Sequence, residues 1–149
     1  MKKSVMVLAL GAMLGSCGGG DASENAALEN AIEEVAKIDT ATLNTPCACA
    51  EAAIPVLDAS IIATNQIIQL SKDTDDTEDP EFQKKGRDLM EKIQGVQTKM
   101  MEVNFKCMGD LALLTTEAGE DCKAMKVYLE KLANAAEAEQ ALREETDRR

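Results

Sequence analysis

The residues with the most chemistry to offer are four cysteines, Cys47, Cys49, Cys107 and Cys122. Four thiols can close disulfides, hold a metal ion or exchange disulfides with a substrate. Four-thiolate zinc sites usually place two cysteines about two to four residues apart. Here one residue separates Cys47 from Cys49, and fourteen separate Cys107 from Cys122. Catalytic disulfide exchange favours Cys-x-x-Cys beside a strand, and the sequence has neither. The spacing therefore favours structural disulfides over a metal site or a thiol oxidoreductase.

The spacing also limits how these cysteines can pair. A bridge between Cys47 and Cys49 would strain the chain across one intervening residue. We therefore expect both to pair with Cys107 and Cys122, and two such arrangements remain open. A disulfide closing a loop of this length stabilises a fold by roughly 2 to 4 kcal/mol.

The 149-residue chain contains no histidine, which excludes every mechanism that needs an imidazole. After residue 17 its only serines are Ser23, Ser60 and Ser71, and none lies in a Gly-x-Ser-x-Gly setting. The many carboxylates fit the solvated faces of helices. We expect no catalytic residue, no metal ligand and no cofactor.

An acidic segment, residues 73–79, invites comparison with a calcium loop. Asp73, Asp75 and Thr77 alternate as EF-hand ligands do. However, Glu78 stands where that loop needs glycine, and Lys84 stands where it needs a bidentate glutamate. The segment is therefore predicted to be a solvated turn before a helix, with weak cation binding as the alternative.

The N-terminus carries a separate signal. Lys2 and Lys3 precede an apolar run over residues 5–14, and Leu14-Gly15-Ser16-Cys17 ends it. The run is about half the length that crosses a bilayer, so it indicates an export signal rather than a permanent span. This segment resembles the signal and lipobox of bacterial lipoproteins, and the resemblance covers residues 1–17 only.

The resemblance implies that residues 1–16 are removed and that Cys17 receives a diacylglycerol and an N-acyl chain. More than one acyl chain gives stable anchoring, because each buried methylene contributes about 0.8 kcal/mol. Gly18, rather than Asp, follows Cys17, which in such lipoproteins favours the outer membrane, facing the periplasm or the cell surface. Residues 17–22 would then form a flexible, lipid-anchored tether.

The charge balance bears on partners. The chain has 16 basic and 27 acidic residues, and losing Lys2 and Lys3 leaves 14 basic residues and a formal charge of −13. Nucleic acid and anionic lipid surfaces would repel such a protein. We expect a membrane partner only through the lipid at Cys17, together with an envelope protein partner.

Helical periodicity predicts the elements that position the cysteines. The first helix is expected over residues 24–38, and the second after Thr45-Pro46, with a kink or fresh start at Pro55. The third begins at Asp79-Pro80, and the fourth near Thr116. Apolar or small residues recur at alternating three- and four-residue spacing in the last three: Cys47, Ala50, Ile54, Leu57, Ile61, Thr64 and Ile68; Phe82, Gly86, Leu89, Ile93, Val96, Met100, Val103 and Cys107; and Ala118, Cys122, Met125, Leu129, Leu132 and Ala136.

This pattern predicts an all-α fold in which residues 23–149 form a single domain. Three long helices would pack as an antiparallel up-down bundle, with a short additional helix at the N-terminus. All four cysteines would then meet at one end, where disulfides tie the bundle. We expect a non-enzymatic, lipid-anchored interaction or spacer module of the bacterial cell envelope. A lipoprotein that binds a small ligand or a cation is the alternative, ahead of a thiol oxidoreductase.

Overall fold

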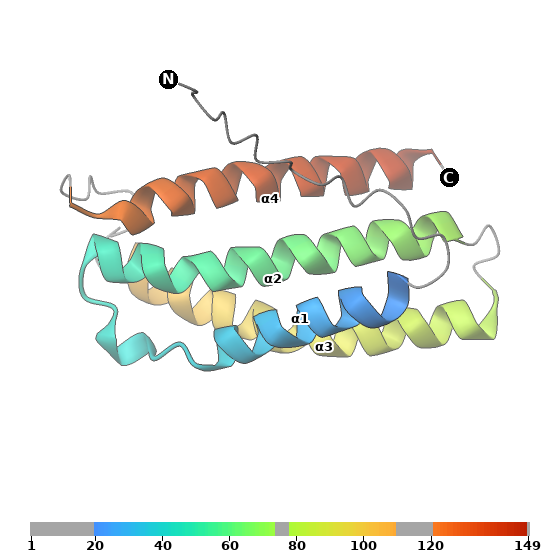
Figure 1. The fold of residues 1–149 in the computed structure, drawn as a ribbon, viewed down its shortest axis with the longest axis horizontal. Coiled ribbons are helices and arrows are strands. Elements are labelled where there is room, and N and C mark those ends of the chain that lie inside the picture. Colours follow the sequence, from blue (N-terminus) through green and yellow to red (C-terminus); the bar gives the residue numbers. More distant parts are fainter. Residues whose placement is uncertain (1–19, 74–77, 110–120, 149) are drawn as a thin grey trace, which may run out of the picture.

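A computed structural model describes residues 20–73, 78–109 and 121–148, and over these residues the chain is all helical (Figure 1). The long helices are α1 (Gly20–Ala36), α2 (Pro46–Asp73), α3 (Pro80–Asn104) and α4 (Lys123–Asp147). A 3-10 turn, η1 (Thr40–Thr42), joins α1 to α2, and a π-helical turn, η2 (Phe105–Gly109), ends α3. The predicted all-α class is confirmed. The signal segment, Cys17 and the following residues 18 and 19 lie outside the described residues.

Capping side chains fix where α2 and α3 begin. The Thr45 hydroxyl accepts a hydrogen bond from the backbone N–H of Ala48 at 3.1 Å, and Asp79 accepts from that of Glu81 at 2.8 Å. In both helices proline occupies the first helical position, where its missing N–H costs nothing. Both starts agree with the sequence prediction.

The N-terminal helix begins earlier than its apolar pattern indicates. α1 starts at Gly20, so the last three residues of the expected tether are helical. Leu28 and Val35 are fully or almost fully buried, and Ile32 packs against the same core. This short N-terminal helix is therefore part of the core.

The helices alternate in direction, but their neighbours differ from those of a simple up-down bundle. In Figure 1, α2 lies between α4 on one side and the α1 and α3 layer on the other. Among the described residues the backbone of α4 lies close along that of α2 and less close to those of α1 and α3. Since α2 and α4 run in the same direction, this pair is parallel. α3 and α4 run antiparallel, as expected, but α2 rather than α3 is the main neighbour of α4.

The composition of α2 explains this arrangement, because α2 is apolar on two sides. Its buried residues are mostly small. Ile68 is buried outside the core clusters, and seven others belong to core clusters shared with α1, α3, η2 or α4: Cys49, Ala50, Ala52, Ala53, Val56, Ala59 and Ala63. Of the stripe predicted for this helix, only Ala50 and Ile68 are buried. Among the described residues α2 is the one helix long and apolar enough to cross a membrane, and a central core helix has the same composition.

Pro55 does not break α2, which runs without interruption from Pro46 to Asp73. The expected fresh start is therefore absent. Proline removes one backbone donor, so the carbonyl of Glu51 loses the partner that a helix would supply. Packing of α2 on three other helices offsets this loss.

The core stripe of α3 is confirmed in detail. Leu89, Ile93, Val96 and Val103 are buried in the helix, and Cys107 is buried in the turn that follows it. These residues recur every three or four positions, as an amphipathic helix requires. The same sequence spacing would extend this stripe to Leu111 and Leu114, which lie outside the described residues.

The sequence prediction fails most clearly for α4. The helix begins at Lys123, with Cys122 as its N-cap residue, rather than near Thr116. Leu129 and Leu132 were assigned to the core stripe, yet they are 55% and 44% exposed. The packed side of α4 instead carries Tyr128, which is buried, and half-buried small residues such as Ala135 and Ala138.

Candidate functional site

Two disulfides tie one end of the molecule. Cys47 pairs with Cys122, and Cys49 pairs with Cys107, which selects one of the two arrangements left open by the sequence. The Cα atoms are 5.7 Å and 5.8 Å apart, within the usual range for a disulfide. The cysteines therefore connect the start of α2 to the end of α3 and to the start of α4, as the topology predicts.

The two bridges differ in their surroundings. Cys49 and Cys107 are both fully buried, in a cluster that also contains Leu43, Val103 and Tyr128. Cys47, the second residue of α2, is only half-buried. The Cys49–Cys107 bridge is thus part of the core, whereas the Cys47–Cys122 bridge lies at its edge.

Tyr128 is the buried titratable side chain nearest to these bridges. It is the only tyrosine in the sequence, and 9% of it is exposed. Burial raises the pKa of its phenol, because the low-polarity core disfavours the phenolate. Its aromatic ring therefore acts as packing material that joins α4 to α2 and α3.

Ion pairs link the helices at the surface. Lys131 of α4 lies 2.6 Å from Asp58 of α2, and Lys92 of α3 lies 2.9 Å from Glu29 of α1. Each of these side chains is a third or more exposed, so solvent weakens the attraction and each pair contributes at most about 1 kcal/mol. These contacts orient the helices rather than form a reactive site.

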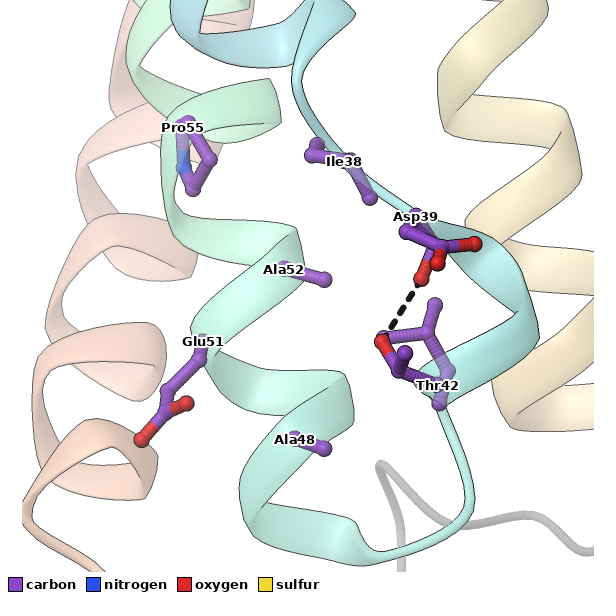
Figure 2. A pocket seen from close by; sticks show the side chains of 8 residues that line it. Ile38, Asp39, Thr42, Ala48, Glu51, Ala52 and Pro55 are labelled. Carbon is purple, nitrogen blue, oxygen red and sulfur yellow. Dashed lines mark hydrogen bonds between the residues drawn. The ribbon is translucent and has the colours of Figure 1, made fainter.

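A shallow pocket of about 210 Å³ lies between η1 and the first turns of α2 (Figure 2). Its walls are mainly apolar: Ile38, Leu43, Ala48, Ala52 and Pro55. Asp39, Thr42 and Glu51 add polar atoms at its edge.

The polar groups of this pocket are largely occupied or turned away. One Asp39 carboxylate oxygen accepts a hydrogen bond from the backbone N–H of Ala41 at 3.0 Å. The Thr42 hydroxyl donates to the Asp39 carbonyl oxygen at 2.8 Å. Figure 2 shows the Glu51 side chain extending away from Asp39, so the two carboxylates do not converge on one point. The geometry suits a small apolar group better than a cation.

The described part of the chain brings no three cysteine or acidic side chains together in a way that would hold a metal ion. Residues 74–77 of the acidic segment lie outside the described residues, while Asp79 caps α3. The cysteines are therefore the predicted site residues that the structure brings together.

Exposed apolar side chains form the feature that sequence analysis missed. Within the described residues the large ones lie on α3, η2 and α4: Met90, Met101, Phe105, Met108, Val127, Leu129 and Leu132. Phe105 is the most open, at 75%. All except Met90 lie in the parts of these elements nearest the disulfides. A large contiguous apolar patch marks a contact site for other proteins, whereas single exposed apolar side chains are usual on soluble proteins.

Met90 and Met101 of α3 and Phe105 and Met108 of η2 define an apolar stripe that is interrupted between Met90 and Met101 by about three helical turns. At 3.6 residues per turn, Met90, Met101 and Phe105 fall within about a sixth of a turn of one another, and Met108 follows in the π-helical turn. Gln94 and Gln97 lie on the same side of the helix, while the charged residues of α3 other than Arg87 lie elsewhere around it. A sequence signal was available, since methionine, phenylalanine and glutamine recur here at helical spacing without a carboxylate.

Comparisons with known proteins give no match: no family model, no curated protein and no solved structure matches this chain.

Proposed function

We propose that this protein is a non-enzymatic, lipid-anchored helical module of the bacterial cell envelope that acts through protein contact. The observation that carries the proposal is the exposed apolar surface on α3, η2 and α4 of an otherwise acidic molecule. A protein of net charge −13 does not need such surface for solubility, and leaving it open to water is unfavourable. Burial against another protein accounts for it.

The lipobox-like sequence supports the anchored part of the proposal. Three residues, 18–20, lead from Cys17 into α1, a reach of about 10 Å even when extended. The start of α1 is therefore held close to the membrane. The start of α2, which carries the bridged cysteines, lies toward the end of the molecule opposite the start of α1. The 28 residues of α2 span about 42 Å. Standing upright, the molecule presents its apolar, disulfide-tied end far from the lipid.

Two measurements on the intact protein test this function. Replacing Cys17 by alanine is expected to move the protein from the membrane fraction to the soluble fraction of the envelope. A Gly19→Ala variant serves as the control, since it keeps the lipobox and the thiol of Cys17. Cross-linking in whole cells is expected to join the wild-type protein to envelope protein through lysines near the apolar surface. Continued membrane retention of the Cys17→Ala variant would contradict the anchoring.

The pocket beside η1 supports a second candidate function, the binding of a small ligand with an apolar group. A ligand that binds only the folded state raises the melting temperature. A screen of fatty acids, amines and divalent metal ions should then find at least one that does so. The Ala52→Leu variant would fill the pocket, and loss of the shift in that variant would locate the ligand there.

A further inference from the structure

We infer that the apolar stripe of α3 and η2 and the apolar stripe of α4, Leu129 and Leu132, bind a second copy of this chain, with α3 of each copy packed against α4 of the other; Val127, on the opposite flank of α4, lies outside this contact. This inference rests on the proposed function and names its partner. It accounts for both unpartnered stripes with one symmetric contact. A two-fold dimer of this kind uses the same surface on both copies. It contains two equivalent contacts, each between α3 of one copy and α4 of the other.

The first step concerns where the stripes point. On α4, Leu129 and Leu132 are turned about a third of a turn from the side that carries Tyr128, Ala135 and Ala138. On α3 the methionine and phenylalanine stripe is turned by a similar angle, in the same rotational sense, from its buried residues. Since α3 and α4 run in opposite directions on opposite sides of α2, equal rotations bring both stripes to the same side of the molecule.

The second step concerns charge. The segment formed by α3 and η2 contains six basic and four acidic residues, whereas α4 contains four basic and six acidic residues. One element is therefore net positive and the other net negative by the same amount. Pairing α3 with α4 of a second copy is complementary at the end away from the disulfides, where five acidic residues and one basic residue of α4 (137–147) would meet four basic and three acidic residues of α3 (81–92).

The third step concerns the alignment along the helices. The exposed residues of α3 and η2 nearest the disulfides, Met101, Phe105 and Met108, lie at the same end as Leu129 and Leu132 of α4. A two-fold axis parallel to the helices keeps these ends together in the dimer. Methionine adapts its shape readily, which suits it to contact leucine and phenylalanine side chains across such a surface.

The fourth step concerns the membrane. A two-fold axis parallel to the helices places both α1 N-termini at one end, so two upright copies anchored at Cys17 can share a leaflet. A two-fold axis perpendicular to the helices would instead place the two anchors at opposite ends of the dimer, about a helix length or roughly 40 Å apart. The tether spans only about 10 Å, so that arrangement does not fit upright copies. Repulsion between a −13 protein and anionic headgroups disfavours lying flat.

The test measures self-association of the full-length mature lipoprotein by sedimentation equilibrium in a density-matched detergent. The wild type is expected to dimerise. Phe105→Gln on η2 and Leu132→Gln on α4 should each weaken the dimer about tenfold or more, because each removes exposed apolar contact from both halves of the symmetric interface. Val127→Gln is the matched control: Val127 is also an exposed residue of α4, but it lies on the opposite flank from Leu129, so its dimer should be unchanged.

Mixing the two weakened variants separates α3-to-α4 pairing from the alternatives. A Phe105→Gln copy keeps its α4 stripe and a Leu132→Gln copy keeps its α3 stripe, so the mixed dimer retains one intact contact. It should therefore be tighter than either variant alone. Circular dichroism melting of each variant confirms that the fold is intact, since all three substituted side chains are exposed.

Three outcomes would overturn the inference: a monomeric wild type, a Leu132→Gln dimer as tight as the wild type, or a Val127→Gln dimer as weak as the other two. These outcomes are distinct from failure of the proposed function. A monomer that still cross-links to a different envelope protein leaves the contact function standing with another partner. Loss of both self-association and cross-linking removes the contact function itself.

Discussion

At the scale of single residues, the cysteines matter most because their bridges are nested. The cysteines of α2 are two positions apart and Cys107 and Cys122 are fifteen positions apart, so each bridge closes only a short additional loop once the other is formed. A loop of about this size corresponds to roughly 3 kcal/mol by chain entropy. Entropy alone would therefore make the two bridges equivalent.

Burial breaks this equivalence. Replacing Cys49 and Cys107 by alanine leaves a void among buried side chains, whereas Cys47 is half-buried and its surroundings can relax. We predict that the free energy of unfolding falls by about 3 kcal/mol for Cys47→Ala/Cys122→Ala and by more for Cys49→Ala/Cys107→Ala. Urea unfolding of both double variants measures this. The opposite order would show that the edge bridge is the more important one.

Tyr128 gives a prediction on pH. Its pKa is raised in the folded protein above the usual value near 10, so folding favours the neutral phenol. Its contribution to stability is complete below pH 10 and is lost as the pH rises through the folded-state pKa. Because it is the only tyrosine, its ultraviolet absorbance titrates without overlap. We expect a raised pKa by absorbance and a decline in stability above pH 10 that is smaller in Tyr128→Phe.

At the scale of helices, the alanines of α2 set how closely its neighbours approach. Ala59 of α2 is fully buried in the cluster that contains Val35 of α1 and Val96 of α3. Ala59→Leu should overpack this site and lower the free energy of unfolding by about 1 to 3 kcal/mol. Ala133→Leu on the exposed side of α4 is the matched control and should change it by less than about 0.5 kcal/mol. Similar effects at both positions in chemical denaturation would count against close packing of α2.

Replacing Pro55 is expected to raise the free energy of unfolding, in contrast to the substitutions above, which lower it. An interior proline costs a helix about 3 kcal/mol, while it also restricts the unfolded chain by up to about 1 kcal/mol. Pro55→Ala should therefore raise the free energy of unfolding by about 2 kcal/mol, since the Glu51 carbonyl regains a helical partner. A gain in stability together with a loss of ligand binding would indicate that proline is kept for the pocket it lines. Destabilisation would instead mean that its ring is needed for packing.

Sequence patterns predicted where the helices lie in the chain better than which helices pack together, and there is a physical reason for this difference. The caps and prolines that start α2 and α3 act locally, and the α3 stripe faces a single core, so both are visible in the sequence. Because α2 has apolar residues on two sides, the sequence pattern assigned the wrong residues to its buried stripe. For α4, leucine at core spacing predicted burial of Leu129 and Leu132, but small residues such as Ala135 pack closest to α2. Which apolar face is covered depends on the neighbour, and that is information about the whole fold.

At the scale of the whole molecule, the structure describes a helical body with its bridges at one end and the start of α1 at the other (Figure 1). The cysteine cluster could be predicted, since alternating helix directions bring the ends of α2, α3 and α4 together. The contact surface could not, because it consists of residues that looked like core. In the proposed account, the anchor and the contact surface occupy opposite ends, which separates attachment from recognition.

The central claim is that this acidic helical body is held to a membrane through Cys17. Mass spectrometry of the N-terminal peptide of the native protein tests it most directly. The account predicts a peptide that begins at Cys17 and carries the added mass of a diacylglycerol and an N-acyl chain. A native peptide that begins at Met1, or one that contains an unmodified Cys17, would contradict it.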